Sequence, residues 1–338
     1  MKDVPGVFRR HRAFPARGLI ALSSLACTGI ASDKNGMSAG PPGQTGQTAG
    51  GGAGSTVAGG GAGSTVPGGG AAGTDPVLVN GGPKLRVLTQ TEYTNSITDL
   101  LGPISTPLDL PPDTFTNGFS AIGGGVVTIN ASAVPMYETA SRAAAAEVFA
   151  SATRWQKFVG CQPKADLSDA CVTTFVKTAG KHAFRRDLTD PEVTQWLQVG
   201  KDIAQAATSA TQGLMAITTG LLQSPYFLYR VETNKLDASS GRLKYDGLSM
   251  ATRLSYLLTG HPPSDALLAA AAAGQLDTAD GVKTAAAPLL TDTNAVARMA
   301  TFFSELSGAQ LVSVVVKDPT MFPSFNTALQ SSMFQATQ

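Results

Sequence analysis

The sequence predicts an all-α protein in which helical bundle domains follow a long disordered tether. Apolar residues recur at helical spacing along most of the chain after residue 84. Two capping boxes, Thr89 with Glu92 and Thr189 with Glu192, mark helix starts because each Thr hydroxyl and Glu carboxylate can satisfy an orphan amide. The segment 28–82 is mostly Gly, Ala, Ser and Thr, and it carries too few apolar side chains to fold.

Residues 1–27 have the layout of an export signal. Five basic residues and one acidic residue precede a short apolar run over 19–26, which is too short to span a bilayer as a helix. Ser24-Leu25-Ala26-Cys27 resembles a bacterial lipobox, although Ser24 stands where Leu is usual. We therefore predict lipidation at Cys27; the alternative is an ordinary secretory signal cut near Ala26 or Ala31. The expected location is exported and membrane-anchored, in the periplasm or at the cell surface.

The predicted tether, residues 28–82, has a root-mean-square span of roughly 40 Å if it behaves as a flexible coil. Of the 25 basic and 24 acidic residues in the chain, 20 and 23 follow the signal, which leaves a weak negative charge and no basic patch. The sequence therefore predicts no nucleic-acid partner. The membrane, reached through the lipid, is the first predicted partner.

The first ordered helix is expected over 85–102, where Gly102 and Pro103 supply the stop. The segment 103–130 reads as a long loop with a short strand over 126–129, and 311–316 reads as a strand or an extended connector. We expect an apolar face formed by Val296, Met299, Phe302 and Phe303 on the helix over 293–306. Further helices are expected over 132–159, from 168, from 189, from 246, and over 265–273, 278–290 and 326–338.

Arg185 and Arg186 are candidate anion-binding residues, since guanidinium groups bind carboxylate or phosphate in a bidentate fork. The alternative is that they pair with nearby Asp187, Asp190 or Glu192 and brace the turn between two helices. Tyr226 and Phe227 either line a pocket or plug the core.

The loop acids Asp109 and Asp113 either serve general acid–base chemistry or form turns beside Pro111 and Pro112. No residue is assigned a catalytic role. His182 and His261 are isolated, and the chain has no CxxC or CxxCH motif, so neither a metal nor a cofactor is predicted.

Cys161 and Cys171 are the two cysteines that remain after Cys27 is assigned to the signal. In an oxidising compartment they are expected to form a disulfide across the turn between two helices. The competing interpretation is two free buried thiols.

Three stretches resemble successive domains of a bacterial family of secreted multi-domain proteins. LTQTEYTNSITDLLG resembles the domain of unknown function 1587, and CVTTFVKTAGKHAFRRDLTDPEV with LLQSPYFLYRVE resembles type 1595, although Asp187 stands where the family usually has Pro. GLSMATRLSYLLTGHPPSDALLAAAAAGQL through MFPSFNTALQSSMFQATQ resembles the start of type 1592. The predicted domains are 83–160 (type 1587), 161–235 (type 1595) and 242–338 (type 1592, truncated). The resemblance implies helical architecture, an envelope location and a c-type cytochrome as a candidate partner.

These observations favour a cell-envelope lipoprotein that works as a helical binding or assembly module. The alternative is an N-terminal fragment of an envelope enzyme, either a cytochrome-partnered redox protein or a polysaccharide-acting hydrolase. The last helix has no stop signal, and it must bury its apolar side against something. We therefore expect the chain to be the N-terminal part of a longer unit.

Overall fold

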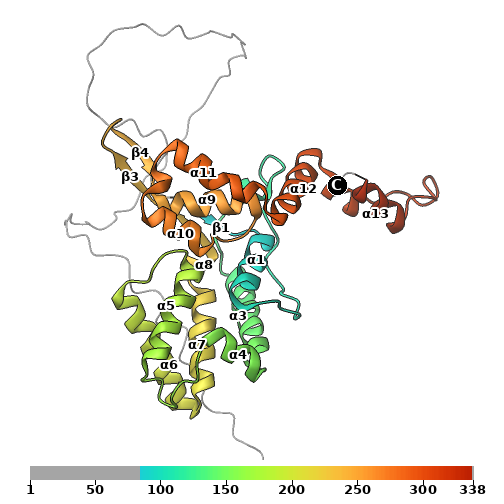
Figure 1. Cartoon of the computed structure of the whole chain (residues 1–338). Coiled ribbons are helices and arrows are strands. Elements are labelled where there is room, and N and C mark those ends of the chain that lie inside the picture. The colour runs from blue at the N-terminus through green and yellow to red at the C-terminus, as the bar shows by residue number, and fades with distance from the viewer. Residues whose placement is uncertain (1–83, 337–338) are drawn as a thin grey trace, which may run out of the picture. The chain divides into compact units, whose positions relative to one another are not determined.

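The computed structural model describes residues 84–336, and it is predominantly helical there (Figure 1). The predicted signal and tether, including Cys27, lie outside the described residues. The helices of the first half are α1 (Gln90–Leu101), α2 (Ser120–Gly123), α3 (Ala133–Phe149), α4 (Ala152–Val159), α5 (Ala170–Phe184), α6 (Asp190–Ala207), α7 (Ala210–Gln223) and α8 (Pro225–Leu228). Those that follow are α9 (Gly247–Thr259), α10 (Asp265–Ala272), η1 (Gln275–Asp277), α11 (Ala279–Leu290), α12 (Thr293–Ser307), η2 (Ala309–Val314) and α13 (Thr327–Gln335).

Local side-chain chemistry sets most helix ends. Both predicted capping boxes are present: Thr89 caps α1 and Thr189 caps α6, each with its Glu side chain returning to the Thr amide. Gly160, Gly260 and Gly308 end α4, α9 and α12 in the left-handed conformation, which only glycine adopts without a steric cost. The helix starts predicted from the capping boxes at Thr89 and Thr189 are therefore confirmed.

Four short strands within residues 84–336 qualify the all-α prediction. β1 (Lys84–Val87) pairs antiparallel with β2 (Tyr229–Glu232), so that Arg86 lies opposite Arg230 and Lys84 opposite Glu232. β3 (Asn234–Asp237) and β4 (Arg242–Tyr245) form a separate hairpin. The helix expected over 85–102 therefore starts later, at Gln90, because the residues before Thr89 pair with a strand distant in sequence.

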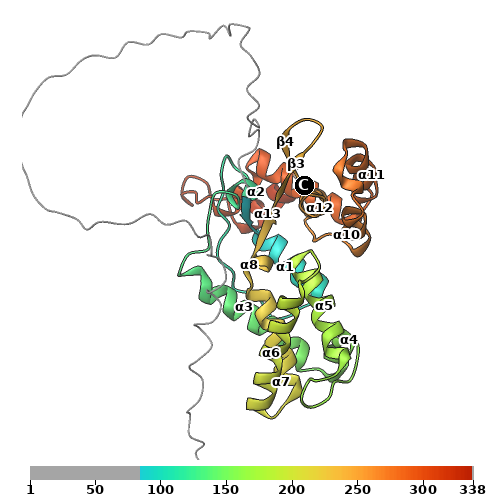
Figure 2. The ribbon, with the colours of Figure 1, turned by 90° about the vertical axis from the view of Figure 1, so that its left-hand side faces the viewer.

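The main hydrophobic core draws on α1 and on α3 to α8. Tyr93 and Ile97 of α1, Ala144 and Val148 of α3, and Leu221 of α7 are almost completely buried in it. Figures 1 and 2 both show α6 and α7 side by side, and α7 also packs on α3. Residues 83–160 and 161–235, predicted as two domains, thus share one core. A smaller core under α9, α10 and α11 is built on Ala251, Leu267, Ala271 and Leu276.

Four local expectations differ from the structure. The helix expected over 132–159 is two helices, because the chain turns extended at Ser151, whose hydroxyl caps α4. No strand forms over 126–129, and 311–316 begins as the 3₁₀ turn η2. The expected apolar face of α12 is largely exposed, since Val296, Met299, Phe302 and Phe303 all remain accessible.

Cys161 and Cys171 form the predicted disulfide. Their Cα atoms lie 6.4 Å apart, which is within the range that a disulfide spans. Cys161 follows the end of α4, and Cys171 lies in the first turn of α5. The bond therefore closes the loop that joins these two helices.

Replacing both cysteines with Ala should lower the free energy of unfolding by about 3 kcal/mol, because the open loop gains chain entropy when unfolded. Denaturant unfolding of the mature chain, followed by tryptophan fluorescence, measures this loss. Wild-type protein in reductant should lose a similar amount, whereas no loss in either sample would contradict a stabilising role.

Candidate functional site

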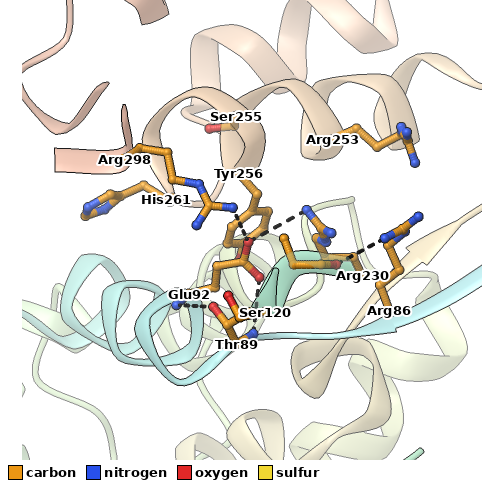
Figure 3. Close-up of polar contacts among 12 residues, drawn as sticks. Arg86, Thr89, Glu92, Ser120, Arg230, Arg253, Ser255, Tyr256, His261 and Arg298 are labelled. Atoms are coloured by element: carbon orange, nitrogen blue, oxygen red, sulfur yellow. Dashed lines mark hydrogen bonds and ion pairs between the residues drawn. The ribbon is translucent and has the colours of Figure 1, made fainter. Parts of the chain in front are cut away.

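Six charged side chains meet where β1–β2, α1, α9 and α12 come together, and we call them the junction cluster: Arg86, Glu92, Arg230, Glu232, Arg253 and Arg298. Residues alternate faces along a strand, so Arg230 and Glu232 share one face of the ribbon, with Arg86 opposite Arg230. Figure 3 shows Arg298, Arg230 and Arg86 in a row, with Arg253 on the α9 side.

Glu92 is the first carboxylate of the cluster and is only 1% exposed. Its Oε2 accepts the Thr89 amide at 3.2 Å, which completes the α1 capping box. Its Oε1 accepts from Arg298 Nη2 at 3.3 Å and lies 3.9 Å from Arg230 Nη1. One side chain therefore caps a helix and pairs with guanidiniums from two other elements.

Glu232 is the second carboxylate and is completely buried. Its Oε2 accepts from Arg253 Nη1 at 2.8 Å, and its Oε1 lies 3.5 Å from Arg86 Nε without a hydrogen bond. Burying a carboxylate is costly unless it is paired, so Glu232 requires these two arginines. It thereby fixes the ribbon to α9.

Tyr256 of α9 lies beside the cluster and is fully buried. Arg185 Nε donates to its hydroxyl at 3.0 Å. Ser96 Oγ lies 2.7 Å from the same hydroxyl, and it donates its own proton to the Glu92 carbonyl at 2.6 Å, so Tyr256 must donate to Ser96. Burial raises the pKa of Tyr256, which keeps the phenol protonated.

The structure gives protein partners to both candidate anion-binding arginines. Arg185 ends α5 with φ of 59°, and its guanidinium donates to the carbonyls of Tyr226, Phe227 and Tyr229 at 2.8–3.1 Å. Arg186 forms a two-pronged pair with Glu192 at 2.9 and 2.7 Å. The bracing alternative thus describes Arg186, while Arg185 contacts backbone carbonyls rather than acids. Anion binding by these two residues stays a prediction.

Arg186 also changes the chemistry of its partner. Its hydrogen bonds, together with those from Thr189, lower the pKa of Glu192 to about 2. The guanidinium stacks over the ring of Tyr226, 4.5 Å from the centroid. Tyr226, Arg185 and Arg186 help to line a cleft of about 130 Å³, whereas Phe227 is buried in the main core.

The loop acids do not form a pair. Asp109 is exposed, whereas Asp113 accepts the Gln90 amide at 2.8 Å at the start of α1. Burial, with the nearby charges of Glu92 and Glu305, raises the pKa of Asp113. No contact in the described part of the chain joins the two acids.

The isolated histidines each contact one acid. His182 lies 3.1 Å from Asp265, and His261 lies 2.8 Å from Asp99. Within residues 84–336 no three His, Cys, Asp or Glu side chains are placed to hold a metal ion. None of the helices in that range is both long and apolar enough to cross a membrane.

Sequence reasoning missed the junction cluster because its members are far apart in the chain. One local signal existed: in Tyr229-Arg230-Val231-Glu232 the charged residues occupy every second position, which is the period of a strand with one polar face. The burial of Glu92 had no such signal, since a Glu in a first helical turn is ordinarily solvated.

Fold and site together define a predominantly helical protein in which three chain segments meet at buried ion pairs. Three family models match these segments: Protein of unknown function (DUF1587) over residues 86–150, (DUF1595) over 171–232 and (DUF1592) over 246–338. The chain therefore carries the DUF1587, DUF1595 and DUF1592 domains in this order and belongs to these domain families. No curated protein and no solved structure matches the chain.

Each family segment supplies charges to the junction cluster. Arg86 and Glu92 come from the first, Arg230 and Glu232 from the second, and Arg253 and Arg298 from the third. The ion pairs therefore connect all three segments. The domain boundaries given in the sequence analysis stay predictions.

Glu92→Gln should lower the free energy of unfolding by about 3 kcal/mol. Gln still completes a capping box, but Arg230 and Arg298 then face a neutral amide while buried. The matched control is Glu138→Gln, which removes an exposed pair with Arg142 on α3 and should cost about 0.5 kcal/mol. Denaturant unfolding of both variants measures the difference, and equal losses would contradict the role assigned to Glu92.

Proposed function

We propose that this chain is an exported, lipid-anchored envelope protein whose helical body binds an apolar surface of a partner protein. The basic start, the short apolar run and Cys27 support the anchor, and the glycine-rich segment 28–82 supports a tether between membrane and body. The binding role rests on one observation, the orientation of α12.

α12 presents its polar side to the protein and its apolar side to solvent. Arg298 pairs with Glu92, and Glu305 accepts hydrogen bonds from the amide and hydroxyl of Ser120. Val296, Met299, Phe303 and Leu306 recur at helical spacing on another face, and all four are exposed; Val296 is 74% and Phe303 52% exposed. A helix that buries its charges and exposes its apolar stripe marks an interaction surface.

The neighbouring segments extend this apolar surface. Leu311, Val314 and Val316 after α12 are exposed, as are Met321 and Phe322. On a further side of α12, a groove of about 380 Å³ lies between Phe115, Ala297, Ala300 and Phe334.

The composition of this region indicates the chemistry of the partner. Residues 293–336 contain four charged side chains, Arg298, Glu305, Lys317 and Asp318. The first two bind within the protein, so little charge remains for recognition. A protein partner with an apolar surface therefore fits this region better than a charged polymer does. A c-type cytochrome is one candidate that the family resemblance implies.

A photo-reactive residue tests the docking surface in cells that make the full chain. Cross-linkers at Val296 and at Leu306 should capture the same protein, which mass spectrometry identifies. The matched control position is Gln195, exposed on α6 and outside the apolar surface. Phe303→Asp should abolish capture from Val296 because a charge in a desolvated interface is costly.

If cross-linkers at Val296 and Leu306 captured no more protein than the one at Gln195, the proposed docking surface would be contradicted. Cross-links only to a second copy of this chain, or only to lipid, would replace the proposed partner by another occupant. Recovery of a c-type cytochrome would favour a redox assembly.

The anchor has its own test. Mass spectrometry of the membrane fraction should find a mature chain that begins at lipid-modified Cys27, and Cys27→Ala should remove the protein from that fraction. Recovery of wild-type chain only in the soluble fraction, with Cys27 unmodified or cleaved off, would contradict lipidation.

A further inference from the structure

The junction cluster holds more positive than negative charge. Four guanidiniums, from Arg86, Arg230, Arg253 and Arg298, share two carboxylates, from Glu92 and Glu232. Two other acids, Asp113 and Glu305, have different partners: Asp113 accepts the Gln90 amide and Glu305 accepts from Ser120. Neither forms an ion pair with an arginine in the described part of the chain. Each carboxylate is thus shared by two arginines, and four positive charges against two negative charges leave the cluster with a net charge of +2.

Arg230 is the arginine of the cluster with the weakest contacts to acceptors. The residue is 7% exposed, yet within residues 84–336 its guanidinium forms no hydrogen bond. Its closest carboxylate oxygen, Oε1 of Glu92, is 3.9 Å away, and its Nε is buried without a partner. The Tyr256 ring, 5.6 Å from Cζ, supplies only a cation–π contact. An arginine offers five donors, and leaving them unused while buried is costly.

The strand register increases the cost. Arg86 lies directly opposite Arg230 in the ladder, and like charges at opposed positions repel. Arg86 Nε is also buried without a hydrogen bond. The ribbon therefore places two guanidiniums together, each with a free Nε–H, at the end of the cluster away from Arg298 (Figure 3).

This end of the cluster is accessible from solvent. The side chains of Arg86 and Arg253 are 26% and 35% exposed, while Glu232 between them is buried. Two partly exposed guanidiniums thus lie on the side of Arg230 that faces away from Arg298 (Figure 3). Guanidinium forks match the paired oxygens of a carboxylate, phosphate or sulfate.

We infer that the junction cluster is a binding site for an oxyanion, of the phosphate, sulfate or carboxylate class, held by Arg230, Arg86 and Arg253. The oxyanion supplies the missing negative charge and accepts the unused donors of Arg230 and Arg86. Because Arg230 is almost buried, the group that enters is small: a free inorganic ion, or the terminal phosphate or carboxylate of a larger molecule. Oxyanion binding at the junction cluster does not depend on docking through α12.

Inorganic phosphate is the first probe, titrated into the purified full chain at constant ionic strength set with sodium chloride. Isothermal calorimetry should show saturable binding, and the thermal midpoint should rise with the same concentration dependence. Arg230→Gln should weaken binding at least tenfold, because it removes charge-assisted hydrogen bonds. The matched control Arg142→Gln, at an exposed position on α3, should bind like the wild type.

A general salt effect gives a different result. Phosphate and sulfate raise midpoints non-specifically by exclusion from protein surfaces, without saturation and equally in every variant. Unsaturable behaviour, or equal binding by Arg230→Gln and wild type, would overturn the inference. Parallel titrations with sulfate, acetate and glycerol 1-phosphate show which class of oxyanion the site prefers. Tighter binding of glycerol 1-phosphate than of inorganic phosphate favours the terminal phosphate of a larger molecule as the ligand. Equal affinity for the two favours the free ion.

If Arg230→Gln does not fold, a measurement on the wild-type chain tests the same site. Nitrogen-15 spectra of the wild-type chain resolve arginine Nε–H groups, and phosphate should shift those of Arg230 and Arg86 while leaving Arg142 unchanged. Arg86→Gln, at a more exposed position, should weaken phosphate binding in the same direction. Unchanged Arg230 and Arg86 signals at saturating phosphate would overturn the site.

Discussion

The buried carboxylate of Glu92 is the constraint on which the rest of this structure depends. It accepts the Thr89 amide and so sets where α1 begins, and it holds Arg298 and so sets where α12 lies. With a side chain 1% exposed, it cannot exchange these partners for water without a large penalty. Three segments that are far apart in sequence are therefore positioned by one charge.

The same constraint explains the orientation of α12. A helix with an apolar stripe ordinarily turns it inward, and α12 would do so if hydrophobic burial alone decided. Arg298 and Glu305 instead face the body, where each has a partner from the segment 84–130. If the apolar stripe turned inward, Arg298 would move away, and the buried carboxylate of Glu92 would keep only the more distant Arg230 as a counter-charge. Ion pairing thus keeps Val296, Met299, Phe303 and Leu306 exposed, which links the charged junction to the proposed docking surface.

Local chemistry made much of the helical part predictable from sequence. The capping boxes at Thr89 and Thr189 involve residues three apart, and the disulfide joins cysteines ten apart, so each can be seen in one window. The strand β1 could not be predicted from one window, because Lys84–Val87 pairs with Tyr229–Glu232, which lies far away in the sequence. The break at Ser151 was visible only as a Ser within an otherwise continuous helical pattern.

The site was harder to predict for the same physical reason. Arg185 and Arg186 are adjacent and basic, which made them the natural anion candidates, but both guanidiniums are satisfied by carbonyls or by Glu192. Arg230 has no acid beside it in sequence except Glu232, and its unmet donors appear only once α9 and β1 close over it. Available donors depend on the tertiary environment of each arginine, so the sequence alone does not show which guanidiniums already have protein partners.

The core shared by the first two family segments bears on what the family unit is. Tyr93 of the first segment packs edge-on against Phe227 of the second, with ring centroids 5.5 Å apart. The third segment contributes Tyr256 to the same core. Separating the segments would expose this apolar surface, and it would also remove Glu92 and Glu232 from the arginines that pair with them. Because both costs fall on the same boundaries, we expect the three segments to unfold together rather than one at a time.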